Sequence, residues 1–512
     1  MRIEEMIAAR RADCSGCEAC ANICPQNAIE MTRDAEGFAY PKINPALCIK
    51  CGRCDATCPA LNFKEKIPVA LPKIFAAVYD DDKIRRHSSS GGIFSALSEI
   101  ILQNGGVVFG AAFDKNWRVI HTAAQNFDEL ENLRGSKYVQ SQIGDVYRQA
   151  KNFLKAGRSV LFSGTPCQCA GLKHFLGEDP DNLLTVELIC HGVPSPALWE
   201  NYIGELGYAH EVKHVNFRSK RYGWGSNLEI NFSDQGHYFF PNDRNPYGKL
   251  FLRSLSERPS CSSCKFRFPN GRADLTIGDA WGIEHFAPEM FDRRGVSLVF
   301  VHTDKGKDFF EQANLKTRRV KFLDAVKRNY AVMIPFTADL RRGNFFAELS
   351  NVPDKLAVME KYFYQDDSEL RGEVDKRNYF AFQKCYQELA AQVRQKFERN
   401  ILVLSSTRDK DEQNALGDFF EQHFPNCGVY LLQSGEEEPL TCTEYFSSFT
   451  AELKDNAATL SDFARRFNVT EIYVENPLRV YIERPLNFNL SAVLDWLKSC
   501  GLPVRTFSRE TE

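Results

Sequence analysis

The stretch RSVLFSGTPCQCAGLKHFL, residues 158–176, decides the fold. It opens with an apolar run that is typical of a buried strand and ends at Ser163. The short loop 164–166 follows, and Cys167 then begins a segment with helical spacing. A thiol at the start of a helix lies against free backbone N–H groups, so we expect Cys167 to favour the thiolate.

Two later stretches repeat this arrangement. LLTVELICHGVPSP, residues 183–196, indicates a strand that ends at Cys190, and RADLTIGDAWG, residues 272–282, indicates a strand that delivers Asp279 to a loop. Strands that end in such loops ahead of helices predict an α/β domain. The ligands of α/β domains bind at the carboxyl ends of the strands, so we expect the site there.

A repeat of four cysteines occupies the first sixty residues. CSGCEACANICP (14–25) and CIKCGRCDATCP (48–59) both follow the pattern C-x2-C-x2-C-x3-C-P. In two-cluster ferredoxins this spacing gives three thiolates to one [4Fe–4S] cluster and the fourth to the other. We therefore predict two clusters, one held by Cys14, Cys17, Cys20 and Cys58 and the other held by Cys48, Cys51, Cys54 and Cys24.

Two other interpretations of this repeat are a pair of zinc sites and a set of reduced structural thiols. Zinc sites often include histidine, and the first histidine of this chain is His87. The spacing favours the clusters, and the segment at about residues 5–65 resembles bacterial-type dicluster ferredoxins.

Four further cysteines fall in the predicted loops of the α/β region, namely Cys167, Cys190, Cys261 and Cys264. One C-x2-C pair and two distant thiolates suit a third [4Fe–4S] cluster, although structural zinc uses the same pattern. The neighbouring ferredoxin repeat favours the cluster. Cys169 is two residues from Cys167 on the helix, so we expect it to point elsewhere.

The stretch RRHSSSGGIFSALSEIILQNGG, residues 85–106, combines serines and glycines ahead of an amphipathic helical pattern. Serine hydroxyls cap free amides, and glycines let a phosphate approach a helix N-terminus. Arg85 and Arg86 add positive charge nearby. The stretch is either the phosphate site of a flavin or nucleotide or an ordinary capped helix.

Seven motifs then occur in a fixed order: RRHSSSGGIFSAL, LRGSKYVQS, LFSGTPCQCAGL, ICHGVPSP, FRSKRYGW, CSSCKF and ADLTIGDAWG. In this order they resemble the family of coenzyme F420-reducing hydrogenase/dehydrogenase beta subunits over about residues 70–350. The resemblance implies an FAD-bearing α/β domain with an iron–sulfur cluster beside the flavin. It also implies electron exchange with F420 or with another small organic substrate.

The resemblance also assigns residues. It places FAD against Ser89, Ser90, Gly91, Gly92 and Lys137. It places Arg218, Lys220 and Asp279 in the flavin or substrate pocket, although a solvated charged loop is an equal interpretation for the first two. His191 is either an acid/base group or a core histidine. We expect Trp281 to serve packing.

Two functions from different classes remain open. The first is an iron–sulfur flavoprotein oxidoreductase with a small-molecule substrate. The alternative is a non-catalytic electron-transfer subunit that connects a partner enzyme to ferredoxin. The sequence does not identify F420 as the substrate, and it leaves the direction of electron flow and assembly into a homo-oligomer open.

The predicted domains are a dicluster ferredoxin domain (1–66), an FAD and iron–sulfur domain (70–350), a helical connector (351–397) and a small domain of unknown role (398–512). The expected fold class is α/β, with an α+β ferredoxin-like start, a central mixed α/β flavin domain and a small C-terminal α/β domain. In the last part, strand-like ILVLSS, GVYLL, EIYVEN and VRTFS alternate with helical stretches.

The composition of the chain limits the classes of function that it can have. The 512 residues are 43% hydrophobic and 26% charged, as in globular proteins, and the net charge of −3 argues against a nucleic-acid partner. No apolar stretch approaches the ~18–20 residues of a membrane span. The start, MRIEEMIAARRADC, has charges where an export signal has its apolar run, so we expect a cytoplasmic chain whose 17 cysteines form no disulfide framework.

Overall fold

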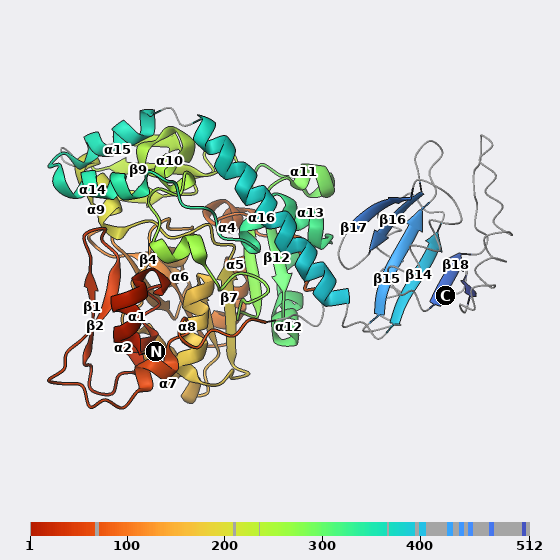
Figure 1. Cartoon of the computed structure of the whole chain (residues 1–512), viewed down its shortest axis with the longest axis horizontal. Helices are drawn as coiled ribbons and strands as arrows, with labels where there is room; N and C mark the ends of the chain where they lie inside the picture. The colour runs from red at the N-terminus through yellow and green to blue at the C-terminus, as the bar shows by residue number, and fades with distance from the viewer. Residues whose placement is uncertain are drawn as a thin grey trace. The chain divides into compact units, whose positions relative to one another are not determined.

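The computed structural model describes residues 2–66, 71–207, 211–234, 236–365, 368–394, 399–405, 427–433, 440–444, 449–453, 471–475 and 504–507. The chain divides into two compact units (Figure 1). The first contains residues 1–66, 73–318 and 328–385, and the second contains residues 67–72, 319–327 and 386–512. The predicted ferredoxin segment and most of the predicted connector thus belong to the same unit as the central α/β region.

An eight-stranded mixed sheet forms the centre of the first unit. Its order is β13 (Leu315–Arg319), β3 (Lys73–Tyr79), β12 (Ser297–Val301), β11 (Leu275–Asp279), β7 (Leu183–Leu188), β6 (Val160–Gly164), β4 (Val107–Phe113) and β5 (Val119–Ala124). The four strands β11, β7, β6 and β4 run parallel, whereas β12, β3 and β5 join by antiparallel pairing. The predicted α/β class is confirmed.

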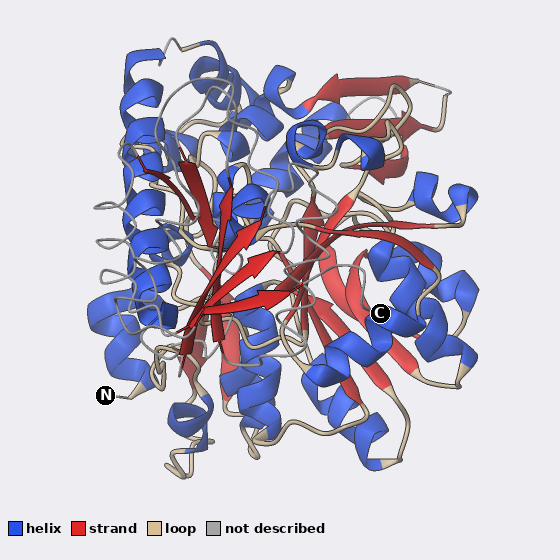
Figure 2. Cartoon of the chain, turned by 90° about the vertical axis from the view of Figure 1, so that its right-hand side faces the viewer, coloured by secondary structure: helices blue, strands red, loops and turns tan. Residues whose placement is uncertain are grey.

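Helices cover both faces of this sheet, as Figure 2 shows for the strands and the helices beside them. Alternate residues of β4 explain this arrangement, because side chains along a strand point to opposite faces. Val108 packs with α5 (Ile93–Gln103), α6 (Phe127–Leu133) and α12 (Asp304–Gln312). Val107 and Phe109 pack with α7 (Val146–Lys155) and α8 (Pro166–Leu176). Parallel strands buried on both faces are apolar throughout, as the sequence of β4 is.

The two cysteine repeats fold into matching elements. The first repeat contains α2 (Ala19–Ile23), which ends at Cys24, and the second contains α3 (Arg53–Thr57), which ends at Cys58; both end cysteines have φ −67° and ψ 116°. A helix, α1 (Ile3–Arg10), precedes them, and the hairpin β1 (Ile29–Arg33) and β2 (Ala39–Ile43) separates them.

This N-terminal part shares a hydrophobic core with later segments. Ile3, Met6 and Phe38 belong to the same buried cluster as Leu198 and Trp199 of α9 (Pro196–Leu206). A shared core makes the ferredoxin segment an integral layer of the first unit, beside α7 and α8 (Figure 1).

The first unit also contains a second sheet and several further helices. An antiparallel sheet contains β8 (Val212–Asn216), β9 (Asn227–Phe232) and β10 (His237–Pro241). The helices are α4 (Asp82–His87), α10 (Pro246–Leu252), α11 (Ile283–Phe286), α14 (Arg342–Asn351) and α15 (Lys355–Tyr364), and α16 (Ser368–Arg394) extends beyond the boundary of the unit. A short helix, α13 (Phe322–Lys327), belongs to the second unit.

The second unit contains a six-stranded mixed sheet. Its order is β17 (Phe449–Leu453), β16 (Leu440–Glu444), β15 (Cys427–Gln433), β14 (Arg399–Ser405), β18 (Glu471–Glu475) and β19 (Val504–Phe507). The four predicted strands are present and run parallel, and the sequence prediction missed the antiparallel strands β16 and β17. The predicted helices of this part lie outside the described residues.

In the part of the chain that the structure describes, no helix combines the length and the apolar character needed to cross a membrane.

Candidate functional site

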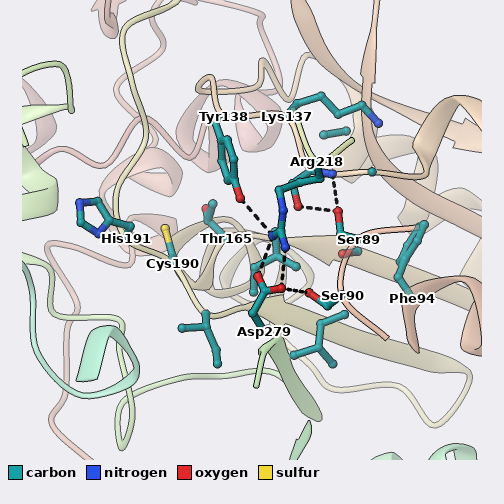
Figure 3. Close-up of a pocket in the computed structure, with 18 of the residues that line it drawn as sticks. Ser89, Ser90, Phe94, Lys137, Tyr138, Thr165, Cys190, His191, Arg218 and Asp279 are labelled. Atoms are coloured by element: carbon teal, nitrogen blue, oxygen red, sulfur yellow. Dashed lines mark hydrogen bonds and ion pairs between the residues drawn. The ribbon is translucent and has the colours of Figure 1, made fainter. Parts of the chain in front are cut away.

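A cavity of about 500 Å³ lies at the carboxyl ends of the parallel strands of the first unit. Thr165 follows β6, His191 follows β7, and Asp279 ends β11, and all three line the cavity. This is the edge of the sheet at which α/β domains bind their ligands, as the sequence predicted. Figure 3 shows these side chains around the cavity.

The serine- and glycine-rich stretch forms one wall. Ser89, Ser90 and Gly92 line the cavity at the N-terminus of α5. The Ser89 hydroxyl lies 3.0 Å from that of Ser136, so this wall is tied to the loop after α6. Gly91 lies outside the lining: a Cβ at Gly91 would collide with the backbone of β3 and β12, so this glycine serves close packing.

A buried ion pair forms another part of the lining. The two terminal nitrogens of Arg218 donate to the two carboxylate oxygens of Asp279, each at 2.6 Å, and Nη1 also donates to Tyr138 at 3.1 Å (Figure 3). Ser90 and Trp224 donate to the same carboxylate at 2.6 and 2.7 Å. Burial disfavours the charged form of both side chains. The attraction between the two charges and the hydrogen bonds outweigh this effect, so the pKa of Asp279 is lowered and the pKa of Arg218 is raised.

Lys220 does not line the cavity, in contrast to the sequence expectation. Its ammonium donates to the backbone carbonyls of Arg85 and Ser90, at 2.7 and 2.6 Å. Burial and the nearby guanidinium of Arg218 lower the pKa of Lys220 to about 7. The residue therefore holds the serine-rich loop in place from behind.

Lys137 lines the cavity with its stem, but its ammonium lies elsewhere. It donates to the carbonyls of Asn132 and Arg134 at the end of α6, both at 2.9 Å, and extends away from Arg218 and Asp279 in Figure 3. Burial lowers the pKa of Lys137 to about 7.

His121 is a lining residue that the sequence analysis missed. It lies on β5, is 6% exposed and stacks on Phe162, and its Nε2 lies 3.0 Å from the carbonyl oxygen of Ser163. Burial lowers the pKa of His121 to about 4, so the ring is neutral and Nε2 carries the proton. Nδ1 has no partner among the described residues, which leaves one acceptor for a bound molecule. A single histidine in a strand has no spacing signal.

His191 and Trp281 lie at different places along the cavity. The His191 ring lies between Phe336 and Phe251, and its Nε2 is 3.3 Å from Glu257. Trp281 is 38% exposed and stacks on Trp224 with ring centres 4.9 Å apart. The stacking on Trp224 agrees with the expected packing role of Trp281, and the residue also lines the cavity.

A second, smaller cavity, of about 40 Å³, is bordered by Cys167, Cys190, Cys261 and Cys264. The structure thus brings the four predicted thiols together. Burial, together with the nearby Cys264, raises the pKa of Cys167 to about 11, and burial raises that of Cys190 to about 12. For the chain by itself, burial therefore opposes the thiolate that the helix N-terminus at Cys167 favours.

The arrangement of these thiols is open. Within the described residues, no three His, Cys, Asp or Glu side chains lie close enough together to hold a single metal ion. The four cysteines border a common space without closing on one point.

The ferredoxin cysteines separate into a buried set and an exposed set. Cys14, Cys17, Cys20 and Cys58 border a cavity of about 20 Å³ and are each at most 9% exposed. Cys24, Cys48 and Cys54 are half-buried, and Cys51 is exposed. Contact between α2 and α3 brings the two repeats together.

The three cavities lie next to one another, because neighbouring cavities share lining residues. Ser15 and Ala60 border both the ferredoxin cavity and the 40 Å³ cavity. Cys190 borders both the 40 Å³ cavity and the large one. A series of neighbouring thiol-bordered cavities therefore leads from the buried ferredoxin set to the large cavity.

Comparison with known proteins assigns both parts of the first unit. The matching family is described as "Coenzyme F420 hydrogenase/dehydrogenase, beta subunit"; residues 74–148 match its N-terminal domain, and residues 157–324 match its C-terminal domain. Residues 13–62 match a "4Fe-4S dicluster domain".

Two curated relatives are similar to more than half of this chain. One is a subunit of the F(420)H(2) dehydrogenase of Methanosarcina mazei, which is 26% identical over 318 residues that cover 58% of this chain and 81% of the relative. The other is the "Coenzyme F420-dependent sulfite reductase" of Methanocaldococcus jannaschii, which is 22% identical over 318 residues that cover 59% of this chain and 46% of the relative.

A solved structure, "Xenon derivatization of the F420-reducing [NiFe] hydrogenase complex from Methanosarcina barkeri", contains a chain that is 19% identical. The match covers 58% of this chain and 94% of that one, with a TM-score of 0.37. The sequence matches confirm the predicted resemblance. Because both domains are matched in order, the central region of this chain carries the N- and C-terminal domains of the coenzyme F420 hydrogenase/dehydrogenase beta subunit family, with a 4Fe-4S dicluster domain ahead of them.

Proposed function

We propose that this chain is an iron–sulfur flavoprotein oxidoreductase. It passes electrons between two ferredoxin-type [4Fe–4S] clusters, a third [4Fe–4S] cluster and an FAD in the large cavity. The FAD exchanges hydride with a small organic substrate. The observation that carries this proposal is the position of Cys190, which borders both the four-cysteine cavity and the large cavity.

The thiol sets fit iron–sulfur clusters. Each set supplies the four thiols that a cube requires, and the sets that contain Cys14 and Cys167 each border a common space. Burial raises the pKa of Cys17 and Cys261, so these thiols stay protonated until a positive centre displaces the proton. The exposed set that includes Cys51 is where an external one-electron partner, such as ferredoxin or a redox partner subunit, makes contact.

The large cavity fits FAD. The Ser89 hydroxyl and the N-terminus of α5 suit an anionic pyrophosphate, and Nδ1 of His121, which has no partner among the described residues, can accept from a ring N–H or a ribityl hydroxyl. Bound FAD takes up two electrons as hydride and releases them singly, which links an organic substrate to one-electron clusters.

Residues of the chain have separate roles around the large cavity. Arg218 and Asp279 fix the flavin-facing wall through their ion pair, and Lys220 holds the loop that carries Ser90. At the rim, Trp281 is 38% and Leu252 44% exposed, and both line the cavity. A partly exposed aromatic rim suits a planar substrate, and F420 is the first to test because both relatives are named for it.

The second candidate is an electron-transfer subunit without a substrate of its own. The name of the Methanosarcina mazei relative, which is one subunit of a dehydrogenase, favours it. The exposed rim at Trp281 favours a substrate site, because a purely internal relay needs no opening to solvent.

The deciding experiment is anaerobic purification, quantification of iron and FAD, and two assays. In one, F420H2 is the electron donor and a viologen dye the acceptor. In the other, dithionite-reduced ferredoxin is the donor and flavin bleaching is followed. Cofactor content of about twelve irons and one FAD, with turnover in either assay, supports the proposal. A chain that holds clusters but no flavin contradicts it and favours the relay.

A further inference from the structure

A buried arginine from the α/β region lies against the first ferredoxin repeat. Arg258 is 1% exposed, and its Nε donates to the carbonyl of Cys14 at 2.7 Å. Nη2 donates to the carbonyl of Ala39 at 3.0 Å and lies 3.7 Å from the sulfur of Cys14. The guanidinium therefore contacts a predicted cluster ligand directly.

The charge of Arg258 has no ion-pair partner within the described part of the chain. Nη1 donates to the neutral side-chain oxygen of Gln140 at 3.1 Å, and the guanidinium carbon lies 4.1 Å from the centre of the Tyr40 ring. The nearby carboxylate of Glu18 accepts instead from the backbone N–H groups of Ile143 and Gly144. A buried charge with only neutral acceptors is costly, so the site requires a further negative group.

The two cysteine repeats allow a comparison of equivalent positions. Gly16 and Lys50 occupy the same position in the two C-x2-C loops, with φ of 67° and 55°. Lys50 shows that a side chain is tolerated in this backbone conformation. At Gly16, however, a Cβ would lie 2.7 Å from Nη1 of Arg258 and 2.9 Å from its guanidinium carbon. Gly16 is therefore explained by the space that the side chains of Arg258 and Gln140 occupy.

We propose that Arg258 raises the reduction potential of the cluster held by Cys14, Cys17, Cys20 and Cys58. This inference rests on the proposed clusters. Reduction adds one negative charge to a cluster that four thiolates already make anionic, and a buried cation beside a ligand sulfur stabilises the reduced form. Burial by itself acts in the opposite direction, because it disfavours added charge.

A raised potential at the buried cluster would favour electron flow from the exposed cluster toward the buried one. The exposed set around Cys51 meets external carriers, and a raised potential at the buried set draws each electron inward, toward the four-cysteine cavity and the flavin. Arg258 thus acts through its positive charge beside a cluster ligand. It takes no part in the chemistry of the substrate.

The test compares Arg258→Gln with Arg258→Lys in the full-length holoprotein. Anaerobic redox titration followed by electron paramagnetic resonance gives the potential of each cluster. A Cys51→Ser variant identifies the signal of the exposed cluster by its loss. Arg148→Gln is the matched control, since Arg148 also joins the ferredoxin segment but donates to the carbonyls of Ala21, Asn22 and Cys24.

We expect Arg258→Gln to lower the potential of the buried cluster by at least a tenfold change in the one-electron equilibrium, about 59 mV. Arg258→Lys retains part of the shift, and Arg148→Gln leaves the buried cluster unchanged. If Arg258→Gln keeps its full iron and both potentials match the wild type, the inference is wrong.

A variant that loses iron does not end the test, because the wild-type chain gives a second measurement. The buried cluster titrates at or above the exposed one if Arg258 compensates for burial, and a buried cluster more than about 59 mV below it overturns the inference. Iron analysis separates the two proposals: a chain without clusters defeats the proposed function, whereas clusters with unaffected potentials defeat only the role of Arg258.

Discussion

Arg218 and Asp279 hold each other through two hydrogen bonds of 2.6 Å, with side chains that are 3% and 12% exposed. The pair connects the end of β11 to the segment after β8 and so joins the central sheet to the three-stranded sheet. Because both charges are buried, each depends on the other for compensation.

Replacement of Asp279 by Asn leaves the Arg218 guanidinium buried without its counter-charge. We expect a loss of about 3–5 kcal/mol in the free energy of unfolding, measured by urea denaturation. The control is Asp128→Asn, which changes an exposed carboxylate of α6 and should cost no more than about 0.5 kcal/mol. Equal stability of the two variants would show that the ion pair contributes little.

Replacement of Lys220 by Met removes two hydrogen bonds to the backbone of the serine-rich loop. We expect roughly tenfold weaker FAD binding, about 1.4 kcal/mol, because Ser90 loses its support while the cavity keeps its lining. The measurement is fluorescence titration of flavin-free protein. Lys213→Met is the control, since that lysine is exposed and pairs only with Glu211 among the described residues. Unchanged affinity in Lys220→Met contradicts a supporting role.

Replacement of Cys261 by Ser tests the third thiol set. We expect iron to fall from about twelve to about eight per chain, with flavin reduction by ferredoxin abolished. The matched control is Cys169→Ala, which changes a fully buried thiol outside the four-cysteine cavity and should keep the iron. If the wild type contains about eight irons and one zinc, the third site is a zinc site.

The neutral state of His121 predicts a pH dependence of stability. Its pKa is about 4 in the folded chain because of burial, against about 6.5 when unfolded, so the unfolded chain binds the extra proton between these values. The stabilising contribution is complete above pH 6.5 and is lost as pH falls toward 4, by about 3 kcal/mol in all.

A His121→Asn variant lacks this titration, so its stability should fall less than that of the wild type between pH 7 and 4. Urea denaturation of both proteins across that range provides the measurement. Parallel profiles for the two proteins would assign the acid sensitivity to other groups.

Sequence reasoning performed best where chemistry imposes a local spacing. The C-x2-C-x2-C-x3-C-P pattern predicted which four cysteines border the buried ferredoxin cavity, and the strand–loop–helix around Cys167 predicted the edge of the sheet that forms the large cavity. Each cysteine repeat and the strand–loop–helix spans a short stretch of sequence. Each signal can therefore be identified within its own stretch.

Contacts between distant segments carried no such signal. Arg258 and Cys14 are 244 residues apart, and Lys220 reaches a carbonyl 130 residues away. The sequence analysis placed Lys220 in the pocket or in a solvated loop, whereas its ammonium holds a backbone segment in place, and the sequence analysis did not single out Arg258. The shared core of Phe38 and Trp199 likewise made the ferredoxin segment part of the larger unit, although its sequence has the features of an independent domain.

The unequal exposure of the two ferredoxin cysteine sets predicts that the two proposed clusters differ in their stability in air. Molecular oxygen reaches the set that contains the exposed Cys51 first, while the set around Cys14 lies beneath protein. Brief aeration should therefore damage the proposed outer cluster before the inner one, so electron entry from outside would be lost while the inner cluster is still intact.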